Sequence, residues 1–270
     1  LAMRLSIRHR TTYRYAPPAN RVALRLGLFP GSDAGQEIID WNVTANGAPV
    51  PRLLRDAFGN GLGQWFAYGP CDGVEIVAEG VVETQDCSGV LGQDRLRCAR
   101  DVFLRETRLT EATDDICDLA RGAQGSDMLE RMHDLARAVR EAVPYESGRT
   151  TAETTAAEAL ALGAGVCQDH AHLFITGART LGIPARYVTG FLNVSDEAEA
   201  LVETHAWAEA FVDALGWVGF DASNGVCPTE HYVRLICGLD ADEAAPIRGN
   251  VGGDSAIDLD AHVDIAQTQQ

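Results

Sequence analysis

Hydrophobic and polar positions alternate along the first hundred residues with the two-residue period of strands that are buried on one face. The segments with this pattern, or with many β-branched residues, are 4–15, 21–29, 37–45 and 74–84. Clusters of Pro, Gly and Asn separate them and predict turns. Regularly spaced short strands predict an antiparallel, sandwich-like β domain, which we assign to residues 1–104.

After residue 104 the hydrophobic positions recur every three or four residues, as on one face of a helix. Residues 126–143 have this spacing, with Ser126 as the predicted N-cap. A shorter helix is predicted over 151–163, and a third, amphipathic helix over 168–181. The helical part of the chain therefore follows the β-rich part and does not alternate with it.

Strand patterns return after the third helix. They cover 185–194, a hairpin over 204–225, and two further segments at 231–239 and 261–270. We assign these strands and the helices to a second domain over residues 105–270. The predicted fold class is α+β, with an N-terminal antiparallel β-sandwich-like domain followed by a domain in which helices pack on an antiparallel sheet.

The chain carries 39 acidic and 22 basic residues, which gives a formal net charge of −17 at pH 7. Nucleic acids and anionic membranes bind clustered Lys and Arg, so we expect neither as a partner. No apolar run approaches the roughly 20 residues that span a bilayer, and the first residues lack the apolar core of a signal peptide. We therefore expect a cytoplasmic protein. The sequence leaves the oligomeric state open.

The seven cysteines include no Cys-x-x-Cys pair, which disfavours a structural zinc site. Their odd number fits a reducing compartment, and six of them are expected to be small, buried side chains. Cys167 differs, because it follows the small-residue loop 163–165 and opens the predicted third helix. The unpaired N–H groups and partial positive charge of a helix N-terminus stabilise a thiolate and can also bind an oxyanion.

A thiolate nucleophile needs a partner for proton transfer. His205 lies on the first strand of the predicted hairpin, on the same face as Trp207 and Glu209. Asp221 ends the second strand, and the hairpin should bring it level with His205. The carboxylate would then orient the imidazole and stabilise the imidazolium. Each residue alone is more often structural than catalytic, but their order and placement favour a site made of Cys167, His205 and Asp221.

Three motifs resemble those of the transglutaminase-like superfamily, and specifically of bacterial transglutaminase-like cysteine proteases. They are GVCQDHAHL with the following LGIPARYVTG, then THAWAEAFV, then GWVGFDASNG. The β-rich first hundred residues and the PIRG segment at 246–249 are also similar to that subfamily, so the resemblance covers nearly the whole chain. It implies a papain-like or transglutaminase-like core, with Cys167 as nucleophile, His205 as base and Asp221 as orienting residue.

Two positions depart from the family pattern. His170 stands where family members commonly have an aromatic residue, and Ala222-Ser223 replaces the usual Pro-Thr after Asp221. His170 lies one helical turn from Cys167, where it could tune the thiolate, but we expect it to fill the aromatic position. Its replacement by Phe should then preserve both stability and activity.

Other side chains near the motifs are candidates for different roles. The potential metal ligands are Asp169, His170, His172, His205 and Glu209. Histidines two positions apart on a helix do not face each other, and no His-Glu-x-x-His motif is present. We therefore expect neither a metal nor another cofactor. Tyr145, Trp207 and Trp217 are expected to be packing residues, although the hydroxyl of Tyr145 could donate to an oxyanion and either Trp could line the acyl channel.

The same three residues permit three functions. In the first, Cys167 forms a thioester with a peptide or protein amide, and water releases the acyl group. In the second, an amine replaces water, as in a transglutaminase. In the third, the fold serves as a non-enzymatic binding module. We expect hydrolysis, because the sequence shows neither a secretion signal nor a calcium site and because all three predicted catalytic residues are present.

Overall fold

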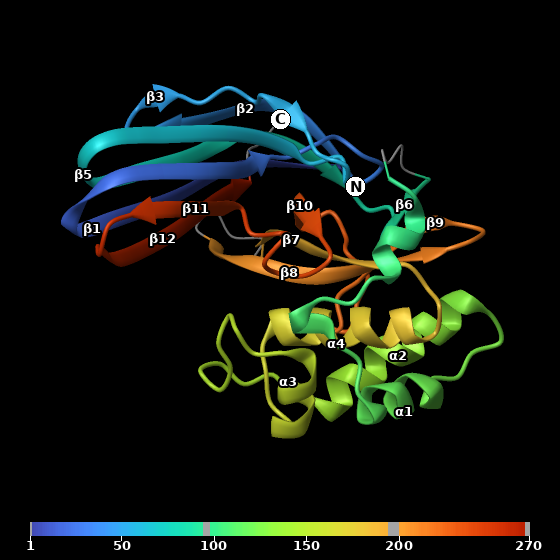
Figure 1. The fold of residues 1–270 in the computed structure, drawn as a ribbon. Helices are drawn as coiled ribbons and strands as arrows, with labels where there is room; N and C mark the ends of the chain where they lie inside the picture. Colours follow the sequence, from blue (N-terminus) through green and yellow to red (C-terminus); the bar gives the residue numbers. More distant parts are fainter. Residues whose placement is uncertain (1, 94–97, 194–199, 268–270) are drawn as a thin grey trace.

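A computed structural model of the chain describes residues 2–93, 98–193 and 200–267. Its helices are α1 Asp114–Gly122, α2 Met128–Ala142, α3 Ala156–Leu162 and α4 Cys167–Thr180, with short 3-10 helices at Arg100–Leu104 and Arg108–Thr110. Its strands are β1 Ala2–Phe29, β2 Gln36–Ala45, β3 Ala48–Pro49, β4 Leu54–Arg55, β5 Gly61–Gln85, β6 Val90–Gly92, β7 Ala185–Asn193, β8 Ala200–Val212, β9 Gly216–Phe220, β10 Tyr232–Gly238, β11 Ile247–Gly252 and β12 Ala256–Gln267. The helices lie together below the antiparallel strands, so the α+β fold class is confirmed (Figure 1).

The N-terminal sheet is built on a long antiparallel ribbon of β1 and β5, with β2 on the other edge of β5 (Figure 1, top). The predicted strands 4–15 and 21–29 are the two halves of β1. Between them the chain bends through register shifts at Arg14, Ala19 and Arg21 and does not form a turn. The prolines that suggested a turn therefore lie where the pairing is irregular, which is where a strand tolerates proline.

The end of the chain returns to the N-terminal sheet. β12 pairs antiparallel with the first half of β1, and β11 pairs with the second half. The range 105–270 predicted for the second domain thus includes two strands that complete the sheet of the first. The sequence predicted part of β12, as 261–270, but not β11, and hydrophobic periodicity does not say which strand a segment pairs with.

Helices α1 and α2 differ from the prediction. The N-cap of α2 is Asp127, whose carboxylate accepts from the N–H of Glu130 at 2.9 Å. Ser126, the predicted N-cap, instead donates its hydroxyl to the Glu130 carboxylate at 2.7 Å. Helix α1 was not predicted, because it has nine residues and buries only Ile116 and Ala120, too few to establish a helical period.

The strands β7 to β10 lie between the helices and the N-terminal sheet (Figure 1). Ala206, Ala208 and Ala210 of β8 share a hydrophobic core with Phe174 of α4, while Trp207 belongs to a separate cluster, as strand alternation requires. On the N-terminal side, β7 and β10 share a second large core with β1 and β5. The sheet that carries the predicted histidine is therefore packed on both sides.

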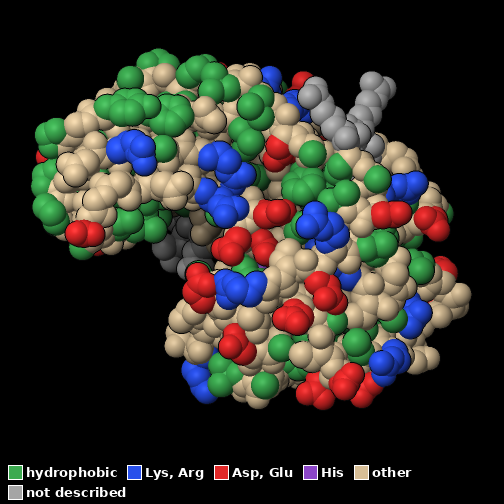
Figure 2. All heavy atoms as spheres, in the orientation of Figure 1, with side chains coloured by type: hydrophobic (Ala, Val, Ile, Leu, Met, Phe, Trp, Pro, Cys, Tyr) green, Lys and Arg blue, Asp and Glu red, His purple; other side chains and the backbone are tan. Residues whose placement is uncertain are grey.

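The surface carries charges of both signs. In the view of Figure 2, apolar side chains gather over the N-terminal sheet, and acidic side chains are spread over the helical half without forming one patch. Within the described ranges, no helix is both long and apolar enough to cross a membrane.

Candidate active site

Cys167 is the first residue of α4, within one residue of the predicted helix start. The loop before it begins at Gly163, which ends α3 with a left-handed φ of 64°. A Cβ on Gly165 would come within 2.8 Å of the Asp169 carboxylate, so the loop requires glycine at this close approach. Cys167 is thereby placed at a helix N-terminus, where the first amides lack intrahelical acceptors.

The buried carboxylate of Asp169 fixes the start of the thiol helix. Its Oδ2 accepts from the N–H of Val166 at 2.8 Å and from the hydroxyl of Thr150 at 2.7 Å. On the other side of the loop, the N–H of Glu146 donates to the carbonyl of Gly165 at 2.8 Å. The backbone that carries Cys167 is therefore held by hydrogen bonds both from its own helix and from the segment after α2.

His205 of β8 and Asp221, directly after β9, form a hydrogen-bonded pair. The Nε2 atom of His205 lies 2.7 Å from Oδ2 of Asp221, and the two side chains are 11% and 1% exposed. The hairpin register pairs Ala208 with Phe220, which places Asp221 opposite Trp207 and not level with His205. The carboxylate therefore reaches the imidazole diagonally across the hairpin.

The structure brings Cys167 to the same imidazole. Burial alone would lower the pKa of His205, but hydrogen bonds to Asp221 and to Cys167, together with their negative charges, outweigh it and raise that pKa to about 9. Because Nε2 is bonded to Asp221, Nδ1 is the ring nitrogen left for the sulfur. The three residues named from the sequence thus lie in the order thiol, imidazole and carboxylate.

Asp221 accepts hydrogen bonds from three residues besides His205. Oδ1 accepts from the hydroxyl of Ser223 at 2.6 Å and from the N–H of Asn224 at 3.2 Å. Oδ2 accepts from the side-chain amide of Asn224 and from the hydroxyl of Tyr232, both at 2.7 Å. Burial would raise the pKa of Asp221, but the hydrogen bond and charge of His205, with the two hydroxyl donors, hold it well below its usual range.

Ala222-Ser223, which replaces the usual Pro-Thr of the family pattern, still provides a hydroxyl donor to Asp221. Ser223 has the hydroxyl that the usual Thr would supply, and that hydroxyl donates to the carboxylate. The sequence did not indicate that Ser223 and Asn224 donate to the carboxylate. It also did not indicate the role of Tyr232, because nothing in the pattern of a strand shows that its first side chain reaches a carboxylate eleven positions earlier.

His170 is buried and contacts backbone carbonyl groups. Its Nδ1 lies 2.9 Å from the carbonyl oxygen of Val166, and its Nε2 lies 2.6 Å from that of Val143. Its ring is parallel to that of the exposed Tyr145, at 6.2 Å between centroids. The side chain packs against an aromatic ring, and it also links the end of α2 to the start of the thiol helix.

Trp207 packs against the pair. Its ring stacks on that of His205 at 6.3 Å and meets Tyr232 edge-on at 5.5 Å. Trp217, the other tryptophan considered, is fully buried in a different cluster with Phe103 and Phe211. Both tryptophans are therefore packing residues in this structure.

The other potential metal ligands have partners of their own. Glu209 is bonded to Arg186 at 2.5 Å and to Arg234 at 2.7 Å, and Nε2 of His172 accepts from the N–H of Ala241 at 3.1 Å. Across the part of the chain that the structure describes, no three His, Cys, Asp or Glu side chains are grouped to hold a metal ion.

Comparison with known proteins identifies two matching family models. Residues 118–222, which include Cys167, His205 and Asp221, match the transglutaminase-like superfamily. Residues 5–83 match the bacterial transglutaminase-like N-terminal region. The two matched ranges follow each other in the order that the sequence motifs indicated.

Relatives span the whole chain. An uncharacterized protein of Mycobacterium leprae is 29% identical over 283 residues, covering 98% of this chain and 99% of its own length. An uncharacterized protein of Mycobacterium tuberculosis is 29% identical over 290 residues, covering 97% and 92%. The structure of a proposed cysteine protease from Cytophaga hutchinsonii aligns with a TM-score of 0.76 at 24% identity, over 100% of this chain and 92% of that one, and so shares the fold. The predicted resemblance is confirmed: residues 118–222 match the transglutaminase-like superfamily, and residues 5–83 match the bacterial transglutaminase-like N-terminal region.

Proposed function

We propose that this protein is a thiol-dependent hydrolase that cleaves an amide or peptide bond through a thioester on Cys167. The observation that supports it most strongly is the His205 imidazole, which is hydrogen-bonded to the buried Asp221 carboxylate and whose pKa is raised by Asp221 and by the nearby Cys167 sulfur. A raised imidazole pKa favours the imidazolium, and an imidazolium beside sulfur favours the thiolate. The superfamily match adds that such thiol chemistry is expected in residues 118–222.

The reaction has two balanced halves. In the first, the Cys167 thiolate attacks the carbonyl carbon, the C–N bond breaks, and Nδ1–H of His205 gives its proton to the leaving amine. In the second, the neutral imidazole takes a proton from water, the hydroxide oxygen attacks the thioester carbon, and the C–S bond breaks. The products are a carboxylic acid and an amine, and Cys167 returns to the thiolate. Asp221 keeps its charge throughout and orients the ring.

The oxyanion of each tetrahedral intermediate needs hydrogen-bond donors. The N–H of Cys167 is the first amide of α4, with no helical carbonyl one turn before it to act as acceptor. The N–H groups of Asp169 and His170 already donate to the carbonyl of Val166, at 3.0 and 3.1 Å. We therefore assign the backbone of Cys167 as the first oxyanion donor.

The substrate in this proposal is a peptide or protein amide. No nucleic acid, membrane or cofactor takes part in the reaction, and the predicted cytoplasmic location stays a prediction. Transfer of the acyl group to an amine shares the first half-reaction and is the alternative outcome of the test below.

The test is acyl-enzyme capture followed by product analysis. The protein is mixed with cell extract, acid-quenched, and digested, and mass spectrometry identifies any acyl group on Cys167. The captured substrate is then turned over in H₂¹⁸O with added monodansylcadaverine as a primary amine. Incorporation of ¹⁸O into the product carboxyl supports hydrolysis, whereas dansyl incorporation supports acyl transfer. Cys167→Ala gives the background of acyl adducts at other residues. If the native protein shows no acyl adduct above that background, both hydrolysis and acyl transfer are contradicted.

A further inference from the structure

Tyr232 contacts both members of the His205–Asp221 pair. Its hydroxyl donates to Oδ2 of Asp221 at 2.7 Å, the same oxygen that lies against Nε2 of His205. Its ring meets that of His205 edge-on at 5.9 Å. Burial and the nearby Asp221 charge raise the pKa of Tyr232 well above its usual value, so the phenol remains a donor at every working pH. The Tyr232 hydroxyl is thus a permanent hydrogen-bond donor to Oδ2 of Asp221, the oxygen that orients the imidazole.

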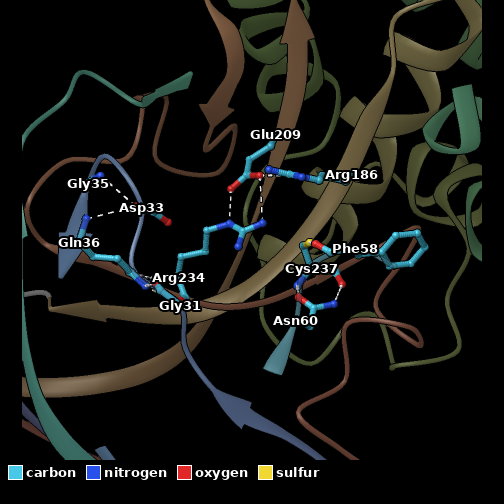
Figure 3. Close-up of polar contacts among 10 residues, drawn as sticks. All are labelled: Gly31, Asp33, Gly35, Gln36, Phe58, Asn60, Arg186, Glu209, Arg234 and Cys237. Carbon is cyan, nitrogen blue, oxygen red and sulfur yellow. Dashed lines mark hydrogen bonds and ion pairs between the residues drawn. The ribbon is translucent and has the colours of Figure 1, made fainter. Parts of the chain in front are cut away.

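Tyr232 is the first residue of β10, which pairs with β7 and lies at one end of the sheet order. The edge of β10 that faces away from β7 would leave buried N–H and C=O groups without hydrogen-bond partners, which is energetically costly. Side-chain amides of the N-terminal domain take the place of a neighbouring strand. Gln36 accepts from the N–H of Arg234 at 2.7 Å and donates to its carbonyl at 2.9 Å, and Asn60 does the same for Cys237, at 2.9 and 2.7 Å. Figure 3 shows both amides facing this edge.

The N-terminal domain also holds the other side of Tyr232. The hydroxyl of Thr84, on β5, donates to the carbonyl of Glu230 at 2.5 Å. The residues two positions before and two positions after Tyr232 are therefore each bonded to a side chain of the N-terminal sheet, Thr84 and Gln36. In addition, the Arg234 guanidinium is bonded to Glu209 of β8 (Figure 3). The segment that presents the hydroxyl has little freedom to move away from Asp221.

We propose that Tyr232 is a positioning residue for Asp221, and that the N-terminal domain keeps it in place through Gln36 and Thr84. The N-terminal β domain then contributes to the working active site through Gln36 and Thr84, which bond to the segment that carries Tyr232 and not to the reacting atoms. The proposal rests on the proposed function, because it assigns Tyr232 a role through the carboxylate that orients His205.

The local test is Tyr232→Phe, with Tyr68→Phe, 82% exposed, as the matched control. The readout is the pH profile of the rate of Cys167 alkylation by iodoacetamide, followed by intact mass. Without the hydroxyl, Asp221 holds the imidazolium less well, so we expect the rate at pH 6 to fall about threefold to tenfold, with the rate at pH 9.5 nearly unchanged. A variant that is only less stable would keep the shape of the profile. A profile that superimposes on the native one would overturn the role of Tyr232.

The remote test is Gln36→Met, which keeps the length of the side chain and removes both hydrogen bonds to Arg234. Gln85→Met is the matched control, since its amide donates only to the exposed carbonyl of Ala34. We expect the same change of profile as in Tyr232→Phe, but smaller, about twofold at pH 6. Should Gln36→Met fail to fold, Gln36→Glu retains the acceptor for the Arg234 N–H and should give an intermediate profile.

The outcomes separate the two proposals. Slow alkylation of Cys167 in the native protein contradicts the proposed function. Fast native alkylation with an altered profile in both variants supports the present inference. Fast native alkylation with an unaltered profile in Gln36→Met and Gln36→Glu, whatever their stability, overturns the role of the N-terminal domain.

Discussion

Asp221 and Glu209 are two buried carboxylates on the face of the β8–β9 hairpin that carries His205. Asp221 is beside His205, and Glu209 follows His205 by four residues on β8. Both are almost fully shielded from water. Glu209 is bonded to two guanidinium groups, and Arg186 and Arg234 keep its pKa below the usual value despite its burial. Asp221 is bonded to an imidazole, two hydroxyls and an amide.

The difference lies in the partner and not in the carboxylate. An arginine stays charged at every working pH, so the ion pairs around Glu209 do not exchange a proton near neutrality. A histidine exchanges its proton near neutrality, so the carboxylate beside it can stabilise a charge that appears and disappears during a reaction. Burial and ionisation alone would have placed both carboxylates among the candidates for a functional site.

The largest effect should come from Asp221→Asn. An amide cannot stabilise the imidazolium, so we expect turnover to fall by about 10³–10⁴-fold while the chain still folds. The measurement is kcat/KM for the substrate captured on Cys167, with circular dichroism to check the fold. Unchanged turnover would remove Asp221 from the mechanism, and neither Asp221 nor Glu209 would then have a role in the reaction.

The converse change is Glu209→Gln, which leaves Arg186 and Arg234 without their shared carboxylate. Removing one partner of a buried ion pair typically costs about 3–5 kcal/mol, so the free energy of unfolding in urea should fall by that amount. Glu79→Gln is the matched control, because its ion pair with Arg8 is exposed and should cost under about 1 kcal/mol. If Glu209→Gln and Glu79→Gln lower the free energy of unfolding equally, the buried ion pairs of Glu209 do not stabilise the fold more than an exposed one does.

The pH dependence of stability should distinguish the two regions as well. The folded pKa of His205, about 9, lies above its ordinary value of 6.5. Its contribution to stability is therefore fully present below pH 6.5 and is lost as the pH rises through 9. We expect the urea midpoint of the native protein to fall over this range, and to fall less in Asp221→Asn. An equal fall in both proteins would mean that Asp221 is not what raises the pKa of the imidazole.

The smallest effect concerns His170. Replacement by Phe keeps the ring stacked on Tyr145, and the Val166 carbonyl keeps its two backbone donors, but the carbonyl oxygen of Val143 loses the imidazole. An unpaired buried acceptor costs about 1–3 kcal/mol, partly offset here by the better burial of a phenyl ring. We expect a net loss of about 1–2 kcal/mol in urea unfolding and activity within a few-fold, which revises the expectation from sequence that stability would be kept. A variant as stable as the native protein would restore that earlier expectation.

The sequence predicted what local pattern and motif can encode. The thiol helix was expected at 168–181 and runs from Cys167 to Thr180, because its apolar face and the Gly-Ile-Pro break are local signals. Helix start, strand and hairpin favoured a site made of Cys167, His205 and Asp221, and the resemblance to transglutaminase-like motifs assigned their roles.

What the sequence could not show is pairing between distant segments. Gln36 and Asn60 are ordinary polar residues in the chain, and only the fold places their amides on the open edge of β10. The same holds for Tyr232 on Asp221 and for β12 on β1, since a period says that a strand exists but not what it meets.

The central claim is that Asp221 and His205 activate the sulfur of Cys167, and its most direct test compares two cysteines in one molecule. Cys117 is partly buried like Cys167, but it lies within α1 and not at its start. Iodoacetamide is added at pH 6, and peptide mass spectrometry follows the labelling rate of each thiol. We predict that Cys167 reacts at least about tenfold faster than Cys117, and that His205→Ala abolishes the difference. Equal rates for the two thiols in the native protein would contradict the account.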